Sequence, residues 1–98
     1  MGNESNLRSV GPVMKKGDMA DAVIEAIYEN NSGRKINIEE HASYFRIQVQ
    51  GECLVKLDTV REMLGSDIAF TDIEACMPSF EGFIRVDTDQ VRFLAESP

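Results

Sequence analysis

The sequence predicts an α+β domain with a mostly antiparallel sheet and two helices. Two kinds of apolar spacing lead to this prediction. Between residues 18 and 31, apolar side chains recur every three or four positions, which is typical of an amphipathic helix. In segments 36–38, 45–49 and 83–94 they alternate with polar residues, which is typical of strands that bury one face. A hydrophobic content of 43% over 98 residues is consistent with one modest core.

The first half of the domain is predicted to be a helix followed by three strands. Asp18 is the expected N-cap, and the segment Asn30-Asn31-Ser32-Gly33 is expected to end the helix, with Gly33 able to adopt a left-handed conformation. A short strand at 36–38, a longer strand at 45–49, the turn at 50–52 and a returning strand at 54–57 complete this half. The buried stripe of the helix is Ala20, Val23, Ile24 and Ile27, with Asp21, Glu25 and Glu29 off it.

The second half repeats this arrangement loosely. Thr59 and Glu62 have the spacing of a capping box, which predicts a short helix that starts at Thr59 and ends near Gly65. Ile73, Ala75 and Met77 alternate and predict a strand. A hairpin follows at 83–94, with its turn at Asp87-Thr88-Asp89. Each half therefore has a helix followed by strands that include a hairpin, a loose duplication of a helix-plus-hairpin unit.

Composition and charge limit the domain organisation and the partners. Residues 1–9 are polar and are predicted to be a flexible tail, and residues 10–98 to be a single domain. No apolar run reaches the roughly 20 residues that span a bilayer, and no secretion signal is visible, so we expect a cytoplasmic protein without a membrane partner. A net charge of −7 argues against nucleic acid. Most acidic residues are expected to form a solvated surface, and a minority to steer docking onto a basic partner.

The residues capable of chemistry are few. His41 is the only histidine and is expected at the surface near a strand start. Cys53 and Cys76 lack CxxC spacing and are expected to be reduced thiols at sheet positions. No triad, phosphate loop or set of converging metal ligands is visible. The sequence therefore predicts no catalytic residue, no metal and no cofactor.

The segment ahead of the last hairpin contains a bulky apolar ring between a proline and a glycine. This segment is expected to be a loop, and it comprises Met77, Pro78, Ser79, Phe80, Glu81 and Gly82. The Phe80 ring is either folded back into the core or held out for a partner, and the residues alone leave both open.

Almost the whole chain, from Val10 to Leu94, resembles the small effector proteins of soluble bacterial diiron multicomponent monooxygenases, in the toluene, arene and alkene branch. Single pieces of the resemblance are weak, but their order and spacing together are specific. They are the entry Val10-Gly11-Pro12-Val13-Met14, the helix start Gly17-Asp18-Met19, the central segments Lys35–Glu39 and Tyr44–Ile47, and the closing segment Met77–Leu94.

The resemblance implies a non-catalytic subunit that docks on a diiron hydroxylase and modulates its active site, oxygen activation, coupling and regioselectivity. A reductase and in some systems a ferredoxin are functionally linked. One implied docking element is the segment 77–82, with Phe80 as an aromatic anchor and Gly82 allowing close backbone approach. The other is an apolar N-terminal arm that orders on binding or, alternatively, a strand at the sheet edge, and it comprises Val10, Gly11, Pro12 and Met14.

Two other classes of function stay open on the residues alone. The first is a small regulatory domain that binds a metabolite between its sheet and helices, for which ligand-induced thermal stabilisation is expected. The second is a small enzyme that uses Cys53 or Cys76, which requires an exposed thiol of low pKa.

Overall fold

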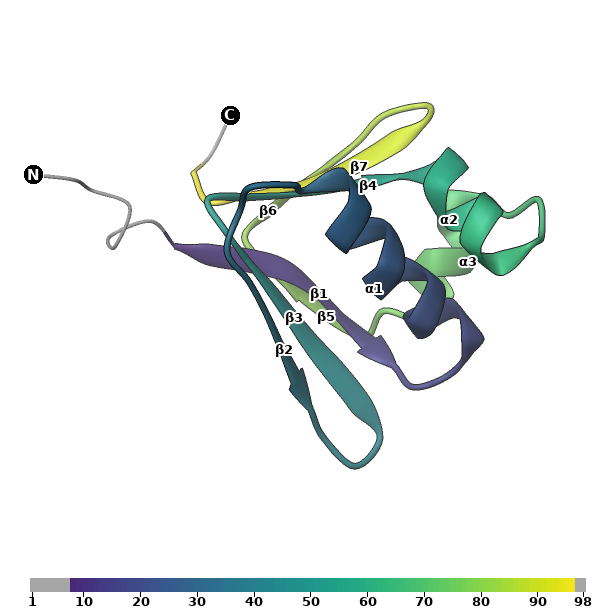
Figure 1. Cartoon of the computed structure of the whole chain (residues 1–98), viewed down its shortest axis with the longest axis horizontal. Coiled ribbons are helices and arrows are strands. Elements are labelled where there is room, and N and C mark those ends of the chain that lie inside the picture. Colours follow the sequence, from purple (N-terminus) through teal and green to yellow (C-terminus); the bar gives the residue numbers. More distant parts are fainter. Residues whose placement is uncertain (1–7, 97–98) are drawn as a thin grey trace, which may run out of the picture.

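The chain forms two antiparallel sheets that diverge from one another, with helices packed between and beside them (Figure 1). The computed structural model describes residues 8–96. The first sheet has the strand order β2-β3-β1-β5 and the second the order β4-β7-β6. The strands are β1 (Ser9–Lys15), β2 (Ile36–Glu40), β3 (Tyr44–Gln50), β4 (Glu52–Lys56), β5 (Ser79–Glu81), β6 (Phe83–Val86) and β7 (Gln90–Leu94), and the helices are α1 (Asp18–Asn30), α2 (Leu57–Leu64) and α3 (Phe70–Ala75). The predicted α+β class is confirmed, with three helices and two sheets in place of two helices and one sheet.

The predicted duplication is visible in the strand order. The run β1-α1-β2-β3 folds with the order β2-β3-β1, and the run β4-α2-α3-β6-β7 folds with the equivalent order β6-β7-β4. Each unit is thus a strand, a helical segment and a hairpin. β5 lies outside this scheme, because it directly precedes β6 along the chain but pairs with β1 in the first sheet.

Helix α1 buries the predicted stripe. Ala20, Val23 and Ile27 are buried, Ile24 is partly buried, and the acidic residues off the stripe are exposed. Asp18, however, is the first helical residue and not the N-cap, and no side chain caps this end. Its carboxylate lies in the first turn, where it interacts favourably with the helix dipole.

Helix α2 begins two residues earlier than predicted. It starts at Leu57, and Thr59 is buried inside the helix, where its hydroxyl accepts a hydrogen bond from Asn30 Nδ2 at 3.1 Å. The core position of Leu57 outweighs the capping signal, because tertiary packing overrides local propensity. The predicted end is confirmed, since Gly65 adopts a left-handed conformation with φ 73°.

Two predicted strand features are wrong. Segment 73–77 is not a strand, because Phe70–Ala75 forms α3, whose first turn is held by a hydrogen bond from the Ala69 amide to the Asp72 carboxylate at 2.9 Å. Three alternating residues are too few to distinguish a strand from a helix. The strands on either side of Gly51 also do not form a hairpin. β3 already has β2 and β1 on its two edges, so β4 continues into the second sheet and pairs with β7.

The free edge of β4 is covered by the end of α1. Asn31 is buried, and its amide accepts a hydrogen bond from Leu54 N and donates to Leu54 O, both at 2.8 Å. It also donates to Ile27 O at 2.8 Å, while Asn30 Oδ1 accepts from Lys56 N at 2.9 Å. Asparagine side chains thus pair with backbone groups that a neighbouring strand would otherwise satisfy. The final hairpin is confirmed as β6 and β7.

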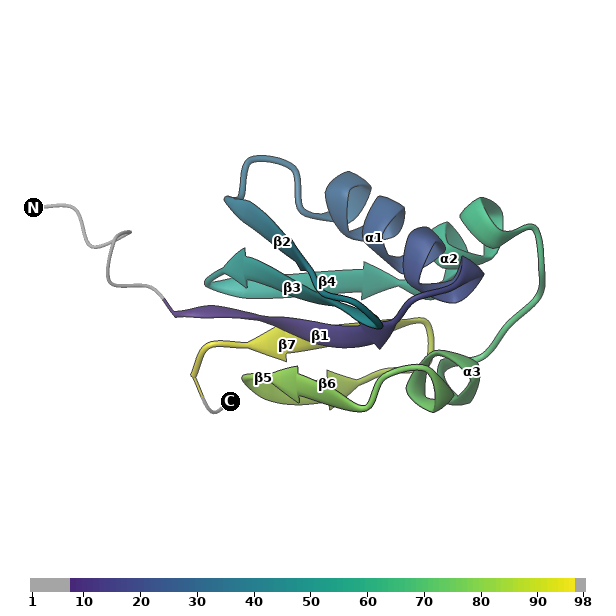
Figure 2. The same ribbon diagram turned by 90° about the horizontal axis from the view of Figure 1, so that it is seen from below.

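One hydrophobic cluster joins both sheets to the helices, and in the second view α1 and α2 lie on the opposite side of the molecule from β5 and β6 (Figure 2). The predicted tail, residues 1–9, falls mostly outside the described residues, and Ser9 is the first residue of β1. Among residues 8–96, no helix has the length and apolar character needed to cross a bilayer.

Candidate docking surface

β5 carries the predicted anchor residue, and it is a strand. Ser79–Glu81 pairs antiparallel with β1, with Pro12 opposite Phe80 and Gly11 opposite Glu81. The prediction of a loop is therefore wrong for residues 79–81, because a strand of three residues is too short to show a period. The two segments predicted separately, 10–14 and 77–82, lie side by side in one sheet.

The N-terminal segment is an internal strand. β1 lies between β3 and β5, so it is neither a strand at the sheet edge nor a segment that waits for a partner in order to fold. Val10 and Met14 are fully buried, and Gly11 and Pro12 are buried beside them. These residues support β5 from within the domain, and direct contact between them and a partner stays a prediction.

The Phe80 ring is partly packed on the core and partly exposed, so it combines the two alternatives that the sequence left open. The ring centroid lies 5.7 Å from that of the buried Phe93, in a tilted arrangement, while 39% of Phe80 stays exposed. One side of the ring thus packs on the core and the other faces solvent. Its neighbours Pro78 and Ser79 are exposed, and Met77 is partly buried against the core.

Gly82 is required by contacts inside the chain. Its φ is 101°, and a Cβ there would lie 2.7 Å from both Leu94 O and Val10 Cγ1. The close backbone approach expected of Gly82 is therefore made within the chain, where the connection between β5 and β6 contacts β1 and β7. It lets the chain pass from one sheet to the other directly after β5.

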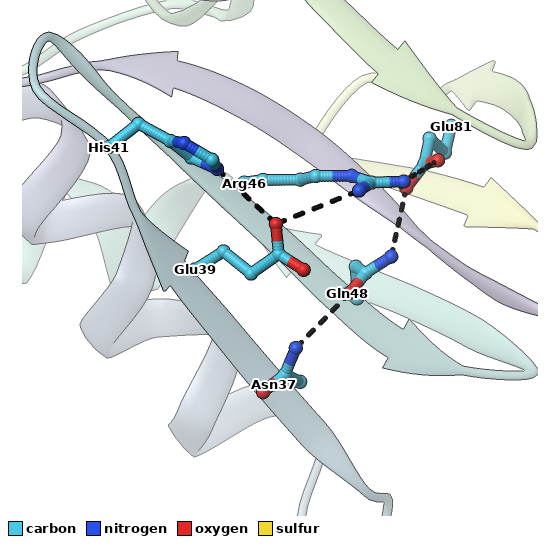
Figure 3. Close-up of polar contacts among 6 residues, drawn as sticks. All are labelled: Asn37, Glu39, His41, Arg46, Gln48 and Glu81. Carbon is cyan, nitrogen blue, oxygen red and sulfur yellow. Dashed lines mark hydrogen bonds and ion pairs between the residues drawn. The ribbon is translucent and has the colours of Figure 1, made fainter.

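A polar network on the outer face of the first sheet holds β5 in place (Figure 3). Arg46 on β3 bonds Glu81 on β5 through Nη2 and Oε2 at 2.5 Å, and through Nε and Oε1 at 3.3 Å. Gln48 Nε2 donates to Glu81 Oε1 at 3.3 Å and Oε1 of the same side chain accepts from Asn37 at 3.2 Å. Arg46 also lies 3.6 Å from Glu39. Strands β2, β3 and β5 are thereby joined through side chains.

Gly11 lies on β1 between the strands that the network joins. It is opposite Glu81 in the register. A Cβ on Gly11 would lie 2.4 Å from Ile47 O. The sequence analysis missed Arg46 and Gln48, although their alternation with Phe45, Ile47 and Val49 places them on the outer face. Only the pairing of β5 with β1 brings Glu81 within their reach.

The network lowers the pKa of Glu81 and raises that of Arg46. The hydrogen bond from Arg46 is the main cause that lowers the pKa of Glu81, and burial opposes it. The same bond is the main cause that raises the pKa of Arg46. Both changes favour the ionised pair, so β5 is tied to β3 by a charge-assisted contact at neutral pH.

The charges are unevenly distributed over the elements. Segments 18–30 and 57–75, which contain all three helices, hold nine Asp/Glu and a single Arg, so they carry −8 and the rest of the chain carries +1 of the total −7. All nine of these acidic residues are exposed. The strands and their connections are therefore the basic part of an acidic protein.

The thiols and the histidine do not form a reactive group. Burial raises the pKa of the Cys53 thiol to about 12, which contradicts a low-pKa nucleophile at that position. Cys76 is partly buried after α3 and not in a sheet, whereas Cys53 is in β4 as expected. His41 is exposed as predicted, stacked on Tyr44 with ring centroids 4.4 Å apart. Among the described residues, no three His, Cys, Asp or Glu side chains are placed to hold a metal ion.

The apolar cavity in the core is too small for a metabolite. It has a volume of ≈ 10 Å³ and is lined by side chains that include Pro12, Phe70 and Phe93. That volume is about one water molecule. A larger hollow opens on the outer face of the first sheet and is bordered by Val13, Lys15, Tyr44 and Pro78, next to β5.

An exposed aromatic ring on an edge strand that is fixed by a polar network is typical of a protein-interaction surface. The chain belongs to the MmoB/DmpM family, whose model matches residues 8–94. It is 34% identical over 88 residues, 90% of this chain and 87% of the relative, to the effector subunit of an alkene monooxygenase system from Xanthobacter autotrophicus (strain ATCC BAA-1158 / Py2). The predicted resemblance is confirmed, and with it a regulatory rather than catalytic component.

Solved structures show the same fold. A chain from a phenol hydroxylase–regulatory protein complex superimposes with a TM-score of 0.76 at 21% identity, covering 88% of this chain and 95% of that one. A second such complex gives a TM-score of 0.72 at 22% identity, covering 89% and 99%. The soluble methane monooxygenase regulatory protein B gives 0.69 at 27% identity, covering 90% of this chain and 65% of that one.

Proposed function

We propose that this protein is a non-catalytic effector subunit that binds the diiron hydroxylase of a multicomponent monooxygenase acting on hydrocarbons or aromatic compounds. The observation that carries the proposal is the family match over residues 8–94. The 34% identical relative is named an effector subunit, and two similar structures are named as phenol hydroxylase–regulatory protein complexes. A reductase, with or without a ferredoxin, supplies electrons in such a system.

The effector acts by changing the hydroxylase, because the chain belongs to a family of regulatory components. It must bind the reactive hydroxylase conformation more tightly than the resting one, because equal affinity for both shifts nothing. A difference of about 1.4 kcal/mol shifts that equilibrium tenfold. Oxygen activation, coupling to product and regioselectivity then follow the population of the reactive conformation.

The docking element is β5 with its flanking residues. Pro78, Ser79 and the open side of Phe80 present the contact surface, and Glu81 holds the strand on the sheet through Arg46. Phe80 has the character of an interface anchor, because its ring is fixed by Phe93 on one side and thus loses little freedom on binding. Val10, Pro12 and Met14 hold β5 from the core side.

We also propose the cytoplasm as the compartment. The two cysteines are free thiols, which suits a reducing environment, and the methane monooxygenase relative is named as soluble.

The test is a titration of this protein into purified hydroxylase with reductase and substrate present, with product and oxygen consumption followed together. The expected result is a saturable rise in turnover and in product formed per oxygen consumed. Turnover and coupling that are the same with and without the protein would contradict the proposed function.

A further inference from the structure

The outer face of the second sheet carries two arginines that lack the partners that other arginines of this chain have. Arg85 on β6 and Arg92 on β7 are directly opposite one another in the register. Two like charges at opposed positions of an antiparallel pair destabilise it. An anionic group bound between or above the two guanidinium groups would offset this repulsion.

The hydrogen bonds of these arginines are incomplete. Arg85 has no hydrogen bond or ion pair to any described residue. Arg92 lies 3.8 Å from Glu52, and its Nε is the buried side-chain nitrogen that has no hydrogen-bond partner among residues 8–96. By contrast, Arg34, Arg46 and Arg61 each donate to an oxygen within the chain. A buried donor without an acceptor requires an explanation such as a ligand or water.

Apolar side chains surround the pair. Phe83 is 45% exposed and lies opposite Leu94, two residues along the strands from Arg85 and Arg92, and Leu54 lies on the other side of Arg92. These residues face away from the core, because Ile84, Val91 and Phe93 occupy the alternate positions of the same strands. Aromatic residues and arginine are enriched in protein interfaces, whereas a small inorganic anion gains nothing from an exposed phenylalanine.

The strand that carries Arg85 directly follows β5 along the chain. Only Gly82 separates β5 from β6. Helices α1 and α2, with their exposed acidic residues, lie on the opposite side of the molecule from β5 and β6, whereas α3 lies on the same side (Figure 2). An acidic partner surface can therefore approach β5 and β6 without meeting the negative charge of α1 and α2.

We propose that Arg85 and Arg92, flanked by Phe83 and Leu94, form a second contact with the hydroxylase and bind carboxylate side chains on its surface. This inference rests on the proposed function and adds the chemistry of the partner surface. The planar guanidinium groups suit paired hydrogen bonds to carboxylates. In this contact the effector supplies the positive charges and the hydroxylase the negative ones. The sequence analysis expected the reverse, with acidic residues of this chain docking on a basic partner.

The test is the affinity of the full chain for purified hydroxylase, measured at 50 and 300 mM salt, for wild type and for the variants Arg85→Gln, Arg92→Gln and Arg85→Glu. Lys35→Gln is the matched control, because it removes one exposed positive charge at the start of β2 in the other sheet. Thermal melts verify that each variant is folded. We expect each glutamine variant to raise the Kd about tenfold at low salt, with a smaller salt dependence.

The charge reversal separates carboxylate recognition from lost packing. Arg85→Glu should weaken binding more than Arg85→Gln, because two facing carboxylates repel, and Lys35→Gln should stay within about twofold of wild type. Glutamine variants within about twofold of wild type would overturn the inference and leave the proposed function intact. Wild-type protein that does not bind the hydroxylase would overturn both. Self-association of the wild type that Arg92→Gln abolishes would assign the face to a second copy and overturn the inference.

Discussion

Arg46 on β3 and Glu81 on β5 form an ion pair across β1, with Nη2 and Oε2 2.5 Å apart. The two residues are 35 positions apart in the sequence. Glu81 lies opposite Gly11 on β1, which separates β3 from β5. The ion pair thus adds a side-chain link to the strand that carries Phe80, the residue next to Glu81.

The ion pair predicts a pH dependence of stability. The pKa of Glu81 is lowered in the folded protein, so the contribution of Glu81 is present above the ordinary value of 4.5 and is lost as the pH falls through the lowered value. Glu81→Gln should therefore be less stable than wild type at pH 7, and the difference should shrink as the pH falls below 4.5. Chemical denaturation across this range measures the difference. Glu74→Gln, which removes an exposed carboxylate, should run parallel to wild type, and the same parallel behaviour for Glu81→Gln would contradict the role of the pair.

Gly82 should tolerate no side chain. Gly82→Ala places a Cβ 2.7 Å from Leu94 O at a positive φ, so we expect a loss of more than about 2 kcal/mol of unfolding free energy. Gly33→Ala is the control, because Gly33 has a similar φ of 87° but nothing within 4 Å of the added Cβ, and it should cost about 1 kcal/mol. Equal losses of unfolding free energy for the two variants would show that the destabilisation of Gly82→Ala does not come from packing where the chain crosses between the sheets.

Asn31 should contribute to stability through its hydrogen bonds, although it is a polar residue. Asn31→Ala removes the bonds to both backbone groups of Leu54 and should cost about 2 kcal/mol, because the amide and carbonyl lose their partner. Ser32→Ala, at the exposed position that follows, should stay within about 0.5 kcal/mol of wild type. Urea denaturation compares the two. A neutral Asn31→Ala would indicate that water replaces the side chain at the edge of β4.

The two thiols should differ in reactivity. Burial raises the pKa of Cys53 to about 12, so the thiolate is scarce at neutral pH and Cys53 should be alkylated only when the domain opens. Mass spectrometry of native protein treated with iodoacetamide at pH 8 measures the label on each cysteine, with Cys53→Ser and Cys76→Ser identifying the sites. Rapid labelling of Cys53 in the folded protein would contradict this burial and restore the thiol as a candidate nucleophile.

The sequence predicts the periodic elements and misses those that depend on distant partners. The stripe of α1 and the alternation of β3 and β7 are long enough to be recognised. α3 and β5 are too short, and the exchange of β4 into a second sheet depends on which strand edges are free. Phe80 and Glu81 are visible in the sequence as candidates. The partners that position them, Phe93 and Arg46, become apparent only when the strands are paired.

The central claim is that this protein activates a hydroxylase through the exposed side of Phe80. The most direct measurement is the concentration of effector that gives half-maximal turnover, compared for wild type, Phe80→Ala and Tyr28→Ala. Tyr28 is the matched control, because it is an aromatic residue 54% exposed on α1, away from β5. We predict that Phe80→Ala raises this concentration at least about tenfold while Tyr28→Ala leaves it unchanged. Identical titrations for wild type and a folded Phe80→Ala would contradict the claim.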